Sequence, residues 1–548
     1  MPSAAVLLPV VLPLAAAAAI TALGAVRMDI GRAGSAGAWA SLIALGAVWV
    51  PVRSTQELVL GSLGFGSAFD VRIDAVAFAF GLMIAAPVAV LLTFQRRTWQ
   101  ESAIAMLALS ASMAAVEAGG IVLAAIAGGT AATLAVVLLD SEDPHSTRPG
   151  WAALLAGWLA LAWVGVLLQV RSGTAVFEAV PVSAVTGPIF ALLAGSAVVA
   201  SGLFPWKAWP SRLWSRRSLS AAGVALATLY PLGLYLLVRG YELGDGRYPH
   251  PAFNLALGLA GIAVAFGAAF RAQAAATRRD YFAEVVPAFG GFALMSIAVG
   301  TGLGLVAGLI VLATAAALIA CLSLLPDGAR LPGLVAVAAA AGLPPGVAFG
   351  SRALGVEATF EGGDFLGLIG LGAMASWAIW VVASARAVGL APDPEATHEG
   401  LPRVAGAIAL GVILLGPALA AMAVAVGDPL ATDVLRPGAV TLGTRLSVID
   451  TTSTVLPAVS LFLPLLLIGA LAYPGIGAAH LTPQPRPAVL RIRSPRWWRQ
   501  ARQIALAARV PEQYRSLLNP RELELAAGAG RPFLWLAALV ALAFAVTR

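Results

Sequence analysis

The stretch of sequence that decides the fold is FPWKAWPSRLWSRRSLSAAGVALATLYPLGLYLLVR, residues 204–239. Its first part is rich in proline, tryptophan and arginine, and it contains Lys207, the only lysine of the chain. The apolar run that follows ends at Arg239 and, at about 20 residues, is long enough to cross the roughly 30 Å hydrocarbon core of a bilayer. Basic residues at the ends of such a run are typical of a membrane span.

The composition extends this prediction to the whole chain. Of 548 residues, 60% are hydrophobic and 11% are charged, whereas soluble domains are about 45–50% apolar and about 25% charged. Apolar runs recur at even spacing, which favours one membrane domain without a large soluble lobe. The sequence therefore predicts an all-α polytopic membrane protein with about 16 transmembrane helices. We place them at 4–26, 36–52, 74–95, 101–119, 120–139, 151–170, 184–204, 218–238, 252–271, 281–301, 303–325, 331–349, 362–388, 403–427, 452–475 and 531–547.

The basic residues cluster at the ends of spans, which argues against nucleic-acid binding, because that function needs a basic stripe on a soluble face. Loops after odd-numbered spans hold more arginines than loops after even-numbered spans. The positive-inside rule then predicts an inner-membrane protein with both termini outside the cytoplasm. The N-terminal run lacks a preceding charge, so we interpret it as a retained first span rather than a cleaved signal.

The segment 484–530 differs from the spans around it. Arg499, Arg502 and Arg509 recur near helical spacing, beside Trp497 and Trp498. This pattern indicates a basic amphipathic helix in the cytoplasmic interface, immediately before the last span. An ordinary positive-inside loop is the alternative.

Cofactor ligands are not evident in the sequence. The single cysteine, Cys321, lies in an apolar run, which excludes a disulfide framework and a thiolate iron–sulfur site. The four histidines fall in loops without the spacing of metal ligands. We expect no cofactor in this chain.

Four local patterns resemble one family. FDVRIDAVAFAF at 69–80 is similar to "vDglSlxF", and residues 204–239 are similar to "qxPfHxWLPdA…sallhxatlvkxGvYLLxR". AGLPPGVAFGSR at 341–352 resembles "GxPPxxGFxxK", and TRRDYFAEVVPAFGG at 277–291 more weakly resembles "DLKRxLAYSxxxxxG". These motifs belong to the antiporter-like subunits of respiratory complex I, Mrp cation/proton antiporters and membrane-bound hydrogenases. The span number and the surface helix favour the long type, which has a C-terminal lateral helix.

The resemblance implies a fold with two inverted five-span repeats, spans 4–8 and 9–13. It also implies interruptions in spans 7 and 12, for which Gly187-Pro188 and Pro344-Pro345 are the candidate breaks. The chain then divides into 1–95 (spans 1–3), 96–240 (first repeat), 241–390 (second repeat), 391–483 (spans 14 and 15), 484–530 (surface helix) and 531–548 (last span).

The family's ionisable positions can be carried over by motif. The glutamate of its fifth span falls at Gly128 or Gly129, and the central lysine of its seventh span falls at Ala200. The ionisable pair of a later span falls at Ala316 and Ala320. The histidine of the second motif becomes Lys207, and two further lysines become Arg279 and Arg352. Alanine and glycine hold no proton, and arginine does not release one. Most of the proton path therefore has no counterpart here.

The remaining candidates for an ion path or an ion pair are Glu117, Lys207, Arg278, Arg279, Asp280, Glu284 and Arg352. Charged groups at membrane depth commonly mark function. For Glu284 we favour the simpler interpretation, a salt bridge to Arg278 or Arg279 at the interface. For Glu117, beside a Gly-Gly turn, a structural role is favoured more strongly.

The functional hypothesis is a non-catalytic, antiporter-like membrane subunit of a complex I-like assembly, with ion translocation degenerate or rerouted and a mainly structural role. Quinone, iron–sulfur or other redox cofactors would belong to partner subunits. The partners would be other membrane subunits, a peripheral module on the cytoplasmic side and lipid. The alternative is an ion-conducting subunit that energises inorganic-carbon uptake, or a subunit of a Mrp-type cation/proton antiporter.

Overall fold

The computed structural model describes residues 4–26, 33–64, 67–95, 97–142, 151–204, 209–214, 219–326, 328–361, 364–390, 400–422 and 427–435, together with Gly469. Within these residues, nine helices are long and apolar enough to cross a membrane, and four shorter apolar helices accompany them. The chain is a multi-pass membrane protein. The predicted spans at 452–475 and 531–547, the surface helix at 484–530, and Lys207 lie outside the described residues.

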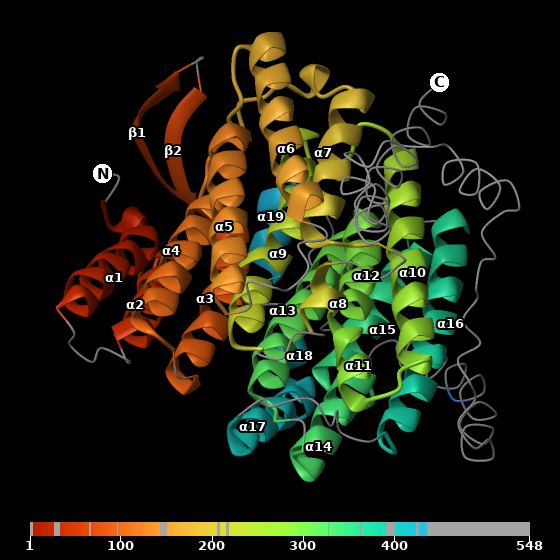
Figure 1. The fold of residues 1–548 in the computed structure, drawn as a ribbon. Coiled ribbons are helices and arrows are strands. Elements are labelled where there is room, and N and C mark those ends of the chain that lie inside the picture. The colour runs from red at the N-terminus through yellow and green to blue at the C-terminus, as the bar shows by residue number, and fades with distance from the viewer. Residues whose placement is uncertain are drawn as a thin grey trace, which may run out of the picture.

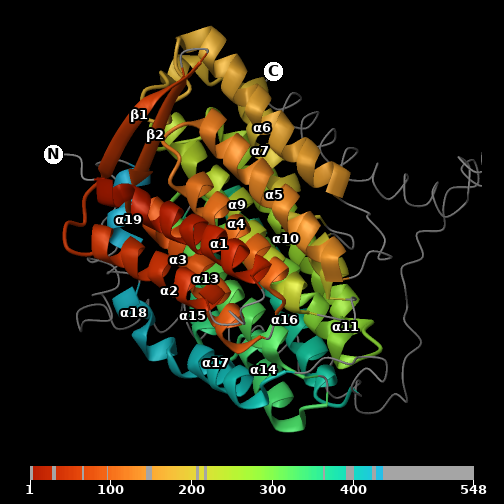
Figure 2. The same ribbon diagram turned by 60° about the vertical axis from the view of Figure 1, so that its left-hand side comes forward.

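The first half of the described chain contains η1 (Ala4–Leu7), α1 (Leu8–Ala25), α2 (Ala33–Trp49), β1 (Gln56–Gly64), β2 (Ser67–Ile73), α3 (Ala75–Phe94), α4 (Trp99–Val116), α5 (Ile121–Glu142), α6 (Trp151–Ser172), η2 (Val182–Ala184), α7 (Gly187–Ser201), α8 (Trp209–Leu213) and α9 (Ser220–Leu243). In this half, α1 to α7 lie beside one another with one hairpin at one end, and α8 and α9 lie against helices of the second half (Figure 1). Figure 2 shows α1 and α2 beside α3 and α4, on the flank of the bundle.

The second half packs against α9 and α3 and completes the bundle. Its elements are α10 (Pro251–Gln273), α11 (Arg278–Ala283), α12 (Val285–Ala298), α13 (Gly302–Leu324), α14 (Arg330–Ala341), α15 (Val347–Glu361), α16 (Asp364–Ala387), α17 (Pro402–Leu414), η3 (Gly416–Ala418), α18 (Leu419–Met422) and α19 (Asp428–Leu435). Small residues let helices approach closely. A Cβ atom on either Gly261 of α10 or Gly291 of α12 would lie 2.6 Å from the carbonyl oxygen of the other.

The hairpin β1–β2 is an antiparallel pair that the all-α prediction missed. It lies at one end of the bundle, and α14 and α17 lie at the other end (Figure 1). Backbone hydrogen bonds attach it to the α4–α5 connection, from Arg72 N to Glu117 O at 2.6 Å and from Gly119 N to Asp70 O at 2.9 Å. Asp74 then ends the hairpin and caps α3, accepting from Ala77 N at 2.8 Å.

The two predicted helix breaks have different outcomes. The break at Pro344-Pro345 is confirmed, because α14 ends at Ala341, Gly342 is left-handed with φ 70°, and α15 begins only at Val347. The end predicted for that span at 349 is wrong, since α15 continues to Glu361.

The break predicted at Gly187-Pro188 is wrong. These residues form the first turn of α7, where a missing proline N–H costs no intrahelical bond. The helix ends instead at Gly202, which has φ 64°. A Cβ atom there would lie 2.5 Å from the indole nitrogen of Trp209.

Candidate functional site

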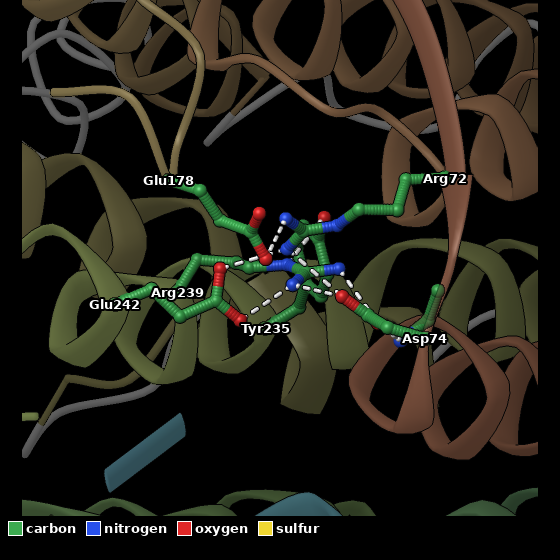
Figure 3. A network of polar contacts seen from close by, with 7 residues as sticks. Arg72, Asp74, Glu178, Tyr235, Arg239 and Glu242 are labelled. Atoms are coloured by element: carbon green, nitrogen blue, oxygen red, sulfur yellow. Dashed lines mark hydrogen bonds and ion pairs between the residues drawn. The ribbon is translucent and has the colours of Figure 1, made fainter. Parts of the chain in front are cut away.

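Five charged side chains meet where the hairpin, α3, α9 and the α6–α7 connection come together (Figure 3). Arg72 pairs with Asp74 at 2.8 Å, with Glu242 at 2.9 Å and with Glu178 at 2.7 Å. Arg239 pairs with Asp74 and with Glu242, each at 2.6 Å. Four of these side chains are at most 7% exposed, whereas Glu178 is 60% exposed. We call this set the outer ion network.

The outer ion network joins two of the sequence motifs. Arg72 and Asp74 belong to FDVRIDAVAFAF, and Arg239 is the last residue of the second motif. The guanidinium of Arg239 also donates from Nε to the hydroxyl of Tyr235 at 3.0 Å. Each arginine therefore lies between carboxylates, an arrangement of charge-assisted hydrogen bonds that compensates burial. Because arginine keeps its proton, the network ties the hairpin to the bundle and does not relay protons.

Two carboxyl groups of the hairpin segment differ in their proton affinity. Burial would raise the pKa of Asp74, but the charges of Arg239 and Arg72 outweigh it and hold that pKa at about 2. Burial and the neighbouring Glu57 carboxyl raise the pKa of Asp70 to about 7. Asp74 is therefore a permanent anion in the network, whereas Asp70 changes charge near neutral pH.

Glu117 lies beside the hairpin but outside the ion network. It follows α4 directly and is fully buried, and neither carboxylate oxygen has a hydrogen-bond partner among the described residues. Its described structural link is the backbone bond from Arg72 N. The structure does not bring Glu117 together with Glu284 or Arg352, which lie on α11–α12 and α15.

The four positions matched to the family's ionisable groups are tightly packed. A Cβ atom at Gly128 of α5 would lie 2.3 Å from the ring of Trp158 on α6. Ala200 of α7 is 1% exposed, and Ala316 and Ala320 of α13 are each 3% exposed. A larger side chain at Gly128 would have to displace the Trp158 ring.

Glu284 lies between α11 and α12 and forms an ion pair, but with another partner than predicted. Its carboxylate accepts a hydrogen bond from Nε of Arg271 of α10 at 2.9 Å. Nη2 of the same guanidinium lies 2.9 Å from the carboxylate and completes the ion pair. Ser211 of α8 adds a longer bond at 3.4 Å. The expected salt bridge to Arg278 or Arg279 is wrong. The end of α10 packs against α11, and this contact places the guanidinium of Arg271 beside the Glu284 carboxylate.

The other charged residues of α11 have local structural contacts. Asp280 forms a capping box with Thr277 at the start of the helix. Arg279 donates from Nε to the carbonyl of Trp214 at 2.8 Å, and Arg278 donates from Nη2 to the carbonyl of Leu390 at 3.3 Å.

Arg352 of α15 is fully buried in an aromatic environment. Its guanidinium carbon lies 4.3 Å, 5.0 Å and 5.8 Å from the ring centroids of Phe289, Phe292 and Trp377, within the range of cation–π attraction. Nη1 donates to the carbonyl of Ala341 at 3.2 Å, a free carbonyl at the end of α14. Nε and Nη2 have no hydrogen-bond partner in the described part of the chain.

The outer ion network was not predicted from the sequence, although three of its five members, Arg72, Asp74 and Arg239, lie in quoted motifs. The available signal was topological: an aspartate at the start of one span and an arginine at the end of another, both on the same predicted membrane side. For metals, the residues that the structure describes contain no cluster of three or more candidate ligands.

Comparison with known proteins identifies the fold. No protein-family model matches, and no curated protein matches significantly. Among solved structures, a chain of the Mrp complex from Dietzia sp. DQ12-45-1b superimposes with a TM-score of 0.73 and 20% identity, over 94% of this chain and 62% of that chain. The present chain thus spans less than two thirds of that relative.

Two respiratory complexes also contain similar chains. One is respiratory complex I from Thermus thermophilus with bound NADH, with a TM-score of 0.64, 19% identity, and 79% and 100% of the two chains covered. The other is the membrane-bound sulfane sulfur reductase, an archaeal respiratory membrane complex, with a TM-score of 0.64, 17% identity, and 98% and 99% covered. The chain therefore has the fold of the antiporter-like membrane subunits that its motifs resemble.

Proposed function

We propose that this chain is an antiporter-like membrane subunit of a complex I-like energy-coupling assembly, and that the usual ion path through the subunit is interrupted. The observation that carries the proposal is the packing at Gly128, where the Trp158 ring fills the space beside the helix. A family member with a glutamate at this place would need that space for the side chain. The subunit would then act mainly as a structural part of its assembly.

The residue types at the other matched positions support the same conclusion. Ala200, Ala316 and Ala320 offer no group that can bind a proton. Arg352 stands where the family's motif has a lysine, and its guanidinium stays charged. A lysine changes its charge readily when it is buried, which is why it serves proton transfer. A fixed positive charge among aromatic rings instead opposes the passage of a cation.

The similar chains support the kind of assembly. Each of the three comparison chains belongs to a membrane complex, and the sulfane sulfur reductase chain matches over nearly its whole length. By this proposal, other membrane subunits flank the chain and a peripheral module binds on the cytoplasmic side. Quinone, iron–sulfur or other redox cofactors reside in those partners. The arginine distribution supports both termini outside the cytoplasm in the inner membrane.

A Mrp-type cation/proton antiporter subunit is the second candidate. The TM-score of 0.73 to the Mrp chain favours it. The identity of the proteins that co-purify with the chain distinguishes the two: redox subunits for a complex I-like assembly, and further antiporter subunits without redox centres for the Mrp type.

Proton flux tests the interruption. The assembly purified through this chain is reconstituted in liposomes, and uptake is followed with a pH-sensitive dye. Replacing Glu284 or Glu117 by glutamine keeps the side-chain size and removes the charge. We expect coupled flux to change less than about twofold, because neither carboxylate belongs to a continuous path. Loss of coupled flux in Glu284→Gln, with the assembly intact by gel filtration, would overturn the proposal.

A further inference from the structure

The hairpin attaches to the bundle beside a buried carboxyl group, that of Asp70 on β2. Val71 pairs with Ala118 of the α4–α5 connection, and the carbonyl of Asp70 accepts a hydrogen bond from the backbone N–H of Gly119. The side chain of Asp70 is 2% exposed, and a Cβ atom at Gly119 would collide with its carboxyl group. The carboxyl group therefore lies directly against the backbone to which the hairpin is attached.

Negative groups surround Asp70 on several sides. The strand register places Glu57 of β1 diagonally across from it on the same face of the hairpin. The two carboxyl groups hydrogen-bond each other, which is possible only when one of them carries a proton. Glu178 of the α6–α7 connection adds a further negative charge. The titratable residue of the α4–α5 connection, Glu117, contributes no positive charge either.

Arg72 is the cation that acts on Asp70, but its charge is already used elsewhere. It favours the ionised form of Asp70, yet it also pairs with three carboxylates of the outer ion network. That network contains two arginines and three carboxylates, so its charges already sum to minus one. Oδ1 of Asp70 has no hydrogen-bond partner among the described residues. An ionised Asp70 would thus be a buried charge without compensation.

We propose that Asp70 is a pH-responsive latch of the hairpin: its protonated carboxyl group lets β2 pack on the α4–α5 connection, and loss of the proton weakens this attachment. The predicted topology places the hairpin outside the cytoplasm, so the latch would respond to the pH of the outer compartment. The latch does not require ion conduction through the subunit. It can therefore be tested separately from the proposed function.

The direction of the pH dependence follows from the proton affinity of Asp70. Burial and the Glu57 carboxyl raise the pKa of Asp70 from its ordinary value of 3.8 to about 7 in the folded protein. The attached hairpin then binds the proton more tightly than the open hairpin does. The attachment is strongest below about pH 4 and weakens as the pH rises to about 7, where it levels off because Asp70 is ionised in both states.

Hydrogen–deuterium exchange of the purified full-length chain tests the latch. Deuterium uptake is followed by mass spectrometry in peptides of β1 and β2, from about pH 5.5 to about pH 8.5, and is corrected for the intrinsic pH dependence of amide exchange. We expect the opening equilibrium of the hairpin to rise by about tenfold or more up to about pH 7 and then to level off.

Three variants separate the latch from a general loosening of the fold. Asp70→Asn keeps the shape of the side chain and removes the titrating group, so the rise should disappear. Glu57→Gln keeps Asp70 but removes a neighbouring negative charge, so the rise should move to lower pH. Asp280→Asn is the control, because Asp280 is an exposed acid at the start of α11, away from the hairpin (Figure 1); its profile should match that of the wild type.

The proposal is wrong if the corrected exchange of the wild-type hairpin does not depend on pH in this range. It is also wrong if Asp70→Asn keeps the wild-type rise. Should Asp70→Asn fail to fold, Glu57→Gln decides the question, because an unshifted rise in that variant would show that another group titrates.

Discussion

Arg239 and Arg352 are both fully buried, but the protein accommodates their charges in different ways. Arg239 lies at the hairpin end of α9 with two carboxylates, Asp74 and Glu242, each 2.6 Å away. Arg352 lies beside a helix break with three aromatic rings and one carbonyl, and no described carboxylate forms an ion pair with it. The first charge is part of a structural network, and the second is an isolated fixed charge.

The two arginines therefore contribute differently to the stability of the fold. Removing one member of a buried ion pair leaves the others as uncompensated charges, which costs several kcal/mol. Removing an isolated buried charge also removes its own desolvation cost. The same substitution should therefore destabilise the protein much more at Arg239 than at Arg352.

The largest effect is expected for Arg239→Met. Asp74 and Glu242 would then lie near each other with one arginine fewer, and the hairpin would lose part of its attachment to α9. We expect a loss of about 3–5 kcal/mol in stability, seen as a lower melting temperature of the purified chain. A melting temperature equal to that of wild type would show that the outer ion network is not a structural clamp.

A smaller loss of stability is expected where α5 packs against α6, at the position matched to the family's glutamate. Gly128→Ala places a methyl group within the Trp158 ring contact and should cost about 1–3 kcal/mol from overpacking. Gly129→Ala is the matched control, because its Cβ atom would lie 3.6 Å from Trp158, an ordinary contact. Equal melting temperatures for the two variants would contradict the packing argument.

The smallest effect on stability is expected for Arg352→Met. Methionine is flexible, fills much of the same space and packs well against aromatic rings. The bond to the Ala341 carbonyl is lost, but so is the cost of burying the charge. We expect the melting temperature to shift by the equivalent of about 1 kcal/mol or less, in either direction. A loss as large as that of Arg239→Met would show that both arginines are structural.

Nine of the 16 predicted spans coincide with described helices that are long and apolar enough to cross a membrane, because a long apolar run has few alternatives to a transmembrane helix. The sequence predicted the break at Pro344-Pro345 because proline lacks the N–H that continues a helix. It missed the hairpin, whose strands of 9 and 7 residues lie between two much stronger apolar signals.

The side-chain partners could not be predicted from residue types alone. Asp74 and Arg239 are 165 positions apart in the sequence and meet only through packing of α3 on α9. Glu284 forms its ion pair with Arg271 and not with the nearby Arg278 or Arg279, because the end of α10 lies against α11.

The most direct test of the account is the coupled proton flux of the assembly that contains Arg352→Met. Arg352 lies at the break between α14 and α15, where the matched motif has a lysine. If the path through this subunit is interrupted, removing the guanidinium changes nothing that protons use, and flux in reconstituted liposomes should stay within about twofold of wild type. Loss of coupled flux, in an assembly that keeps its wild-type melting temperature, would contradict the account, because Arg352 would then take part in conduction.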